Sequence, residues 1–170
     1  MTTATAVATE ARAIVYRTRG SQHGPITRLM SPGDLGEFLK PFVFLDLFGF
    51  DVGGSHKGFG MHPHSGIATL SWLSEGDIRY EDTTGEQGVL PAGGVEWMRA
   101  GNGVWHTGAP APGVKRVQGF QLWVALPASE ENAPPRASTS RPRRCSGKAR
   151  RACCSGATAR RRAPFRRRPR

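Results

Sequence analysis

Three histidines in the middle of the chain could bind one metal ion. His62 and His64 flank Pro63, and 41 residues separate His64 from His106. Side chains two residues apart on a β-strand point to the same side, so the imidazoles of His62 and His64 can close on one ion. Pro63 has a fixed φ and no N–H, which keeps this segment extended and suits the edge or the start of a strand. With His106 from a later strand, the site would present three nitrogen ligands, a set that accepts iron, manganese, nickel, copper or zinc.

Two histidines around a proline also occur in proteins that bind no metal. Whether they form a metal site therefore depends on the secondary structure that positions them. The residues that follow the pair form short strand-like runs at 67–73, 78–82, 88–90, 95–98 and 104–106. Turn signals separate these runs: SEGD at 74–77, TGE at 84–86, PAGG at 91–94 and AGNG at 100–103. Short strands at near-regular spacing, with glycines where the chain reverses, predict an all-β sandwich or barrel.

The first part of the chain adds further strand candidates. Residues 1–11 are small and polar without an apolar run, which predicts a flexible N-terminus and no secretory signal. Residues 13–16 and 25–29 are predicted strands, and residues 42–50, the most hydrophobic segment, are predicted to form a buried strand. That segment is far shorter than the roughly 20 residues of a membrane helix, so no membrane association is expected.

Four tryptophans are each expected to fill the core: Trp72, Trp97, Trp105 and Trp123.

Several motifs of this region occur together. The run HPHSGIATLSWLSEGDIRYEDTTGEQGVLPAGGVEWMRAGNGVWHTGAP, from residue 62 to residue 110, resembles the first cupin domain of the pirin family, whose members are iron-binding proteins with two cupin domains. HPH, PAGG, VEWM and AGNGVWH carry the resemblance, which extends back through KPFVFLDLFGFD and forward through VQGFQLWVALP to cover residues 12–135. It implies a single cupin domain, a double-stranded β-helix or jelly-roll barrel.

The resemblance also implies a ligand set for the metal. In the family the ligands are both histidines of HPH, the histidine that closes the second motif and a glutamate two residues after it. Carried over, these positions are His62, His64, His106 and Gly108. Glycine has no ligand atom, so three neutral imidazoles remain and the other positions of an octahedron stay open for water, oxygen or substrate. The resemblance implies one divalent transition metal, Fe(II), where the donor atoms alone leave the metal open.

Two functions follow from the resemblance. The first is a non-haem, metal-dependent dioxygenase, similar to quercetin 2,3-dioxygenase, in which a flavonol binds the metal and O2 reacts in an aromatic-lined cavity. The second is a redox-sensitive regulatory module that binds a transcription factor or a metabolic enzyme. A third reading is an inactive, truncated product with a preserved site.

Four other ionisable side chains need an interpretation. Glu96 lies in the VEWM run, where a solvent-exposed carboxylate is the ordinary expectation. If it points into the barrel instead, it could replace the missing carboxylate as an outer-shell base, which makes it the candidate catalytic residue. Asp46 lies in the predicted buried strand and needs partners there, which predicts a structural hydrogen-bonding role. His23 and His56 lie in loop-like sequence, and no role is expected for either.

The composition changes abruptly near residue 135. Residues 1–135 hold 10 Lys and Arg and all 13 Asp and Glu, a net charge of 10 − 13 = −3, whereas residues 136–170 hold 14 Lys and Arg and no acid, a net charge of +14. The tail has no Leu, Ile, Val, Met, Trp or Tyr, so it cannot bury enough apolar surface to offset chain entropy. Residues 136–170 are therefore predicted to be a disordered, Arg-rich tail.

Three readings of this tail compete. It could bind nucleic acid, since fourteen cations would neutralise phosphates. It could bind a metal or act in redox chemistry through Cys145, Cys153 and Cys154, although this spacing matches no zinc pattern. It could also be an out-of-frame translation, because Arg, Ala, Pro, Gly, Ser and Cys are what GC-rich codons yield in a wrong frame. We favour the third, because the resemblance stops where the bias begins.

The expected surroundings of the protein follow from these points. The partners would be a small aromatic or enolic substrate and O2, with nucleic acid only if the tail is genuine. A cupin domain that lacks its usual second domain would expose an apolar face, which predicts self-association. All three cysteines lie in the tail, so no disulfide supports the β region and the cytoplasm is the expected location.

Overall fold

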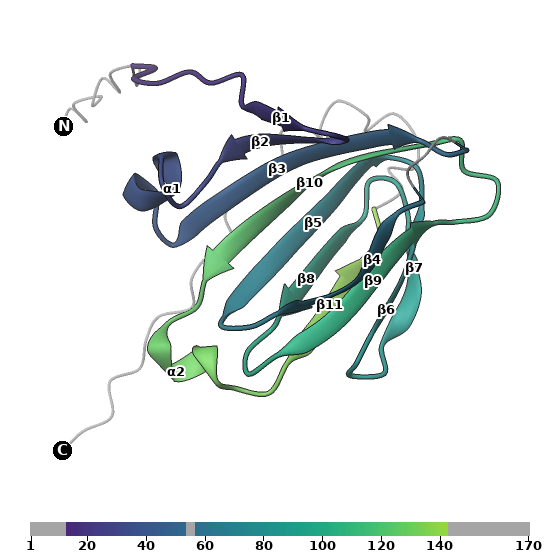
Figure 1. Ribbon diagram of the computed structural model, residues 1–170. Helices are drawn as coiled ribbons and strands as arrows, with labels where there is room; N and C mark the ends of the chain where they lie inside the picture. The colour runs from purple at the N-terminus through teal and green to yellow at the C-terminus, as the bar shows by residue number, and fades with distance from the viewer. Residues whose placement is uncertain (1–12, 54–56, 143–170) are drawn as a thin grey trace, which may run out of the picture.

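The structure is a computed structural model that describes residues 13–53 and 57–142. These residues form two antiparallel sheets that face each other (Figure 1). The larger sheet has the order β1-β2-β3-β10-β5-β8-β11 and the smaller has the order β4-β9-β6-β7. The predicted all-β jelly-roll fold is confirmed.

The strands occupy most of the described chain. Those of the larger sheet are β1 (Ser21–His23), β2 (Ile26–Met30), β3 (Phe42–Asp51), β5 (Ile67–Glu75), β8 (Val95–Arg99), β10 (Arg116–Ala125) and β11 (Arg136–Ser140). Those of the smaller sheet are β4 (Phe59–His64), β6 (Ile78–Asp82), β7 (Gln87–Leu90) and β9 (Val104–Pro110). Two one-turn helices, α1 (Leu35–Phe38) and α2 (Ala128–Glu131), follow β2 and β10.

Two of the predicted boundaries are corrected by the structure. The strand predicted at residues 13–16 is wrong, because none of the strands in residues 13–53 and 57–142 pairs with this apolar segment and Val15 is 93% exposed. At the other end, β11 lies beyond the predicted domain end at residue 135 and pairs with β8. An edge strand is held mainly by backbone hydrogen bonds, so β11 forms without the apolar pattern that would have revealed it. Residues 143–170 of the predicted tail, the N-terminal residues 1–12 and His56 lie outside the described residues.

The interior has a polar layer between two apolar clusters. One cluster contains Phe48, Phe50, Leu73, Ile78, Leu90 and Val117, and the other contains Met98, Ala100 and Val104. Along β9, the inward residue after Val104 is His106, and along β5 the inward residue before Leu73 is Ser71. Apolar packing therefore fixes the strands on both sides of the layer that holds the histidines.

The outer face of the larger sheet is also apolar. Directly opposite residues on neighbouring strands form the rows Leu47–Phe120–Trp72 and Leu45–Leu122–Leu70–Trp97. The prediction that every tryptophan fills the core is therefore wrong, since Trp72 is 38%, Trp97 37% and Trp105 51% exposed. Strand alternation is the cause, because the inward positions beside Trp72 and Trp97 are taken by Ser71, Leu73, Glu96 and Met98. Self-association through such a face stays a prediction.

No helix in the described part of the chain has the length and hydrophobicity needed to cross a membrane.

The turn before β9 ties both histidine-bearing strands to the rest of the fold. The carbonyl of Gly101 accepts a hydrogen bond from the N–H of Gly66, which lies just after β4, at 2.7 Å. Gly101 has a φ of +53°, and a Cβ added there would lie 1.9 Å from the carbonyl oxygen of Ala133. Only glycine fits this position without a shift of the backbone.

We expect Gly101→Ala to lower the free energy of unfolding by at least about 2 kcal/mol, because the left-handed conformation alone costs a residue with a Cβ roughly 1–2 kcal/mol. Urea unfolding followed by tryptophan fluorescence measures the loss. Gly33→Ala is the control, since an added Cβ there meets no atom within 4 Å; it should stay within about 0.5 kcal/mol of the wild type. Equal unfolding midpoints for the two variants would contradict this account of the turn.

Candidate metal centre

Two neighbouring strands bring the three histidines together. In the pairing of β4 with β9, His62 lies directly opposite His106, and His64 follows two residues later on β4. Each of the three offers a ring nitrogen, and these nitrogens lie within 4.8 Å of one another. The predicted convergence of His62, His64 and His106 is therefore present in the structure.

Local contacts set which nitrogen of His62 faces the cluster. Its Nδ1 lies 2.7 Å from the carbonyl oxygen of Gly60, so this nitrogen carries the proton and donates the bond. The other nitrogen, Nε2, then has its lone pair free and lies 3.0 Å from Nε2 of His106. Two imidazole nitrogens bound side by side to one ion need about this spacing, because metal–nitrogen bonds are about 2.1 Å long.

The environment of His64 supports the same reading. Its Nε2 is buried and has no hydrogen-bond partner among the described residues. A buried polar atom without a partner is rare, and a metal ion would satisfy it. The ring packs edge-on against Trp123, with 5.0 Å between the centroids, which holds its orientation. The three side chains therefore fit a metal ion.

Burial keeps two of the histidines neutral. The pKa of His64 is lowered to about 4, first by burial and then by the charge of His62. The pKa of His106 is also lowered to about 4 by burial and by the other two histidines, against an opposing effect of Asp82. At neutral pH both rings are deprotonated, so a metal ion does not have to displace a proton from either.

Gly108 leaves the fourth position of the family's ligand set without a side chain. It lies two residues after His106 on β9, on the same side of the strand, and lines the same cavity. A Cβ added there would lie 3.2 Å from Cγ2 of Ile78. The strands that carry the histidines therefore contribute no carboxylate at this position.

A cavity of about 90 Å³ lies between the two sheets beside His62 and His106. Much of its lining is apolar, with Phe48, Leu73, Ile78 and Leu90 among the residues that surround it. On the larger sheet its polar lining residues are Asp46, Ser71, Glu96 and Gln121. The sequence pointed to the two acids; Ser71 and Gln121 were missed, although both are polar residues at inward positions of otherwise apolar strands.

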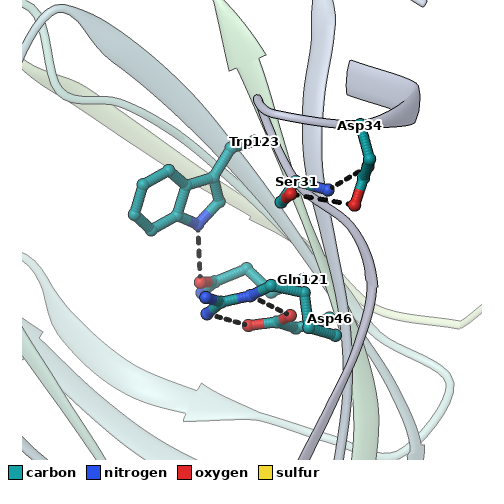
Figure 2. Close-up of polar contacts among 6 residues, drawn as sticks. Ser31, Asp34, Asp46, Gln121 and Trp123 are labelled. Carbon is teal, nitrogen blue, oxygen red and sulfur yellow. Dashed lines mark hydrogen bonds and ion pairs between the residues drawn. The ribbon is translucent and has the colours of Figure 1, made fainter. Parts of the chain in front are cut away.

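Asp46 and Gln121 are held by partners on their own side of the cavity. The carboxylate of Asp46 accepts hydrogen bonds from Nε and Nη2 of Arg28 at 3.2 and 3.4 Å (Figure 2). The amide of Gln121 donates to Ser71 Oγ at 3.3 Å. It also accepts a hydrogen bond from the indole N–H of Trp123 at 2.9 Å (Figure 2). The predicted structural role of Asp46 is confirmed.

Glu96 is buried, which corrects the expectation of a solvent-exposed carboxylate. Its side chain is only 8% exposed and lines the cavity from β8, because alternation along VEWM turns Glu96 and Met98 inward and Trp97 outward. Burial, and to a lesser extent the negative charge of Asp82, raise the pKa of Glu96 to about 7. His23, by contrast, lies on the exposed strand β1 and is not part of the histidine cluster.

The raised pKa of Glu96 predicts a pH-dependent cost to stability. The folded state holds the proton up to about pH 7 and the unfolded chain only up to its ordinary pKa of 4.5, so stability is lost as the pH rises through this window. In metal-free protein, Glu96→Gln should have a higher free energy of unfolding than the wild type. We expect this difference to be about 2 kcal/mol larger at pH 8 than at pH 5. Urea unfolding at both values measures it, with Glu86→Gln, an exposed position, as the control. An equal gain at pH 5 and pH 8 would contradict a buried, proton-binding Glu96.

Comparison with known proteins identifies the family. A family model described as Pirin matches residues 25–124. A pirin-like protein from Caulobacter vibrioides is 40% identical over 111 residues, which are 65% of this chain and 40% of that protein. The chain thus spans about two fifths of the length of the curated relatives it matches.

Solved structures agree with the fold. The crystal structure of a quercetin 2,3-dioxygenase from Acinetobacter baumannii is 30% identical with a TM-score of 0.62, and the match covers 68% of this chain and 43% of that one. The bacterial pirin YhhW from Escherichia coli, solved in complex with nickel(II), is 24% identical with a TM-score of 0.60, covering 72% of this chain and 54% of that one. The Pirin family model covers more than half of the chain, which shows that the chain belongs to the pirin family.

Proposed function

We propose that this chain binds one divalent transition metal, Fe(II), through His62, His64 and His106 and catalyses the dioxygenation of a flavonol such as quercetin. The observation that carries the proposal is the convergence of three imidazole nitrogens, one of them buried without a partner, at the wall of a mostly apolar cavity. The A. baumannii relative, a quercetin 2,3-dioxygenase, supports the choice of reaction. The nickel complex of YhhW makes nickel the second metal to test.

Different residues of the chain would have different roles in such a reaction. The three imidazoles hold the metal, which when bound supplies a Lewis acid and an electron path between substrate and O2. Phe48, Phe59 and Leu73 line the cavity and keep water from the reacting groups. Because two of the ligands stay neutral at pH 7 and Gly108 adds no charge, the protein would not neutralise the ion, which favours an anionic, deprotonated hydroxyl of the substrate as a further ligand.

The size of the cavity limits how a flavonol could bind. Sites that enclose a drug-sized ligand usually measure roughly 300–1,000 Å³, and this cavity measures about 90 Å³. A flavonol has three rings, so one ring would enter beside the histidines and the others would lie at the mouth. The regulatory role and the cytoplasmic location that the sequence suggested stay predictions.

Oxygen uptake tests the proposed function. Protein loaded with Fe(II) or with Ni(II) should consume O2 when quercetin is added, and His106→Ala should reduce the rate to the level of buffer that contains the metal, because two nitrogens bind an ion far more weakly than three. His23→Ala is the matched control and should keep the wild-type rate, since His23 lies outside the cluster. Uptake that survives in His106→Ala, or that is absent from metal-loaded wild-type protein, would contradict the proposal.

A further inference from the structure

A row of polar residues crosses the inner face of the larger sheet. Asp46 lies directly opposite Gln121, Gln121 opposite Ser71, and Ser71 opposite Glu96, so four neighbouring strands each contribute one member. All four line the cavity, together with His62 and His106 from the other sheet. The cavity therefore has a metal-binding wall and a hydrogen-bonding wall.

Three members of this polar row already have partners. Arg28 donates to the carboxylate of Asp46, and Gln121 uses its amide on Ser71 and Trp123. Figure 2 shows Asp46, Gln121 and Trp123 close together. These residues therefore satisfy one another's hydrogen bonds within the protein.

Glu96 is the exception. Among the described residues no hydrogen bond or ion pair reaches its side chain, although it is more than nine-tenths buried. Its carboxyl oxygens are not among the fully buried polar atoms that lack a partner, so they border the cavity, and a hydrogen-bonding partner there would offset the cost of burying the group. Because the group points into a cavity that the histidines share, a bound ligand is the partner that the site offers.

We propose that Glu96 binds a hydroxyl group of the ligand whose other oxygen reaches the three-histidine centre, so that the cavity selects an aromatic ring with at least two hydroxyl groups. The inference rests on the proposed function for its metal centre, and it adds the residue that sets ligand specificity. The cavity, about 90 Å³, is smaller than the roughly 150 Å³ cavity known to bind a benzene ring, so at most one ring would enter it. The neighbouring apolar side chains, such as Phe48 and Leu73, would contact the ring faces and edges, while the oxygens reach the two polar walls.

Selectivity of this kind follows from hydrogen bonding at a buried site. A ring with one hydroxyl can reach the metal centre and leaves Glu96 unpaired, whereas a ring with two can satisfy both. A hydrogen bond to a charged or strongly polar buried group changes affinity by about ten- to a hundredfold. The second hydroxyl should therefore raise the affinity for the ligand at least about tenfold.

The test compares ligands that differ by one hydroxyl in variants that differ at one side chain. Phenol, catechol, resorcinol and hydroquinone are titrated by calorimetry into the full chain loaded with Zn(II), which is redox-inert, without oxygen. At least one dihydroxybenzene should bind about tenfold or more tightly than phenol to the wild type. Glu96→Leu should remove this preference, Glu96→Gln should reduce it, and both should leave the affinity for phenol within about twofold. Glu86→Gln should behave as the wild type.

The outcomes separate this inference from the proposed function. A preference for dihydroxybenzenes that persists in Glu96→Leu, or its absence from the wild type, would overturn the role of Glu96. Zinc content measured on the same samples checks that the variants still bind the metal. If Glu96→Leu does not fold, Glu96→Gln, which preserves the shape of the side chain, is used in its place. Glu96-dependent binding without oxygen uptake would contradict the dioxygenase and leave the inference standing. Oxygen uptake without Glu96-dependent binding would contradict the inference about Glu96 and leave the dioxygenase standing.

Discussion

The pairing of β4 with β9 is the interaction on which the rest of the site depends. Its register places His62 opposite His106, and strand alternation then brings His64 to the same side. A slip of one residue would turn the histidines of one strand to the outer face. The hydroxyl of Thr107 donates to the carbonyl of Phe59 at 2.7 Å, and the turn at Gly101 holds the loop after His64, so this register is fixed near both ends of the ladder.

The polar side chains buried between the sheets lower the stability of the fold, and their presence there indicates a function. Two neutral histidines, His64 and His106, and Glu96, whose pKa is raised to about 7, occupy positions where apolar side chains would pack between the two clusters. Nε2 of His64 also has no hydrogen-bond partner among the described residues. Perturbed ionisable groups of this kind are typical of functional sites. Gly108 on β9 contributes no carboxyl group, and Glu96, which lines the same cavity from the opposite sheet, is not part of the histidine cluster.

Short-range patterns predicted an all-β sandwich or barrel and the pair His62 and His64, whereas the jelly roll rested on the resemblance to pirins and His106 lies on a distant strand. Alternation put His62 and His64 on one face, and turn signals bounded most strands. Glu96 was harder, since VEWM alternates equally well in either orientation and only packing against the other sheet decides which face is buried. Ser71 and Gln121 join the site through the register of β5 and β10, which strand composition does not encode. The edge strand β11 has no apolar pattern at all.

The central claim is that three histidines on paired strands bind a metal without a carboxylate beside them on β9. Metal content per chain tests it most directly, by elemental mass spectrometry on protein purified without chelator or nickel-affinity resin. We expect about one transition-metal ion per chain, because the three ring nitrogens lie within 4.8 Å of one another. A soluble, folded protein with close to no bound metal, even after exposure to Fe(II), would contradict it.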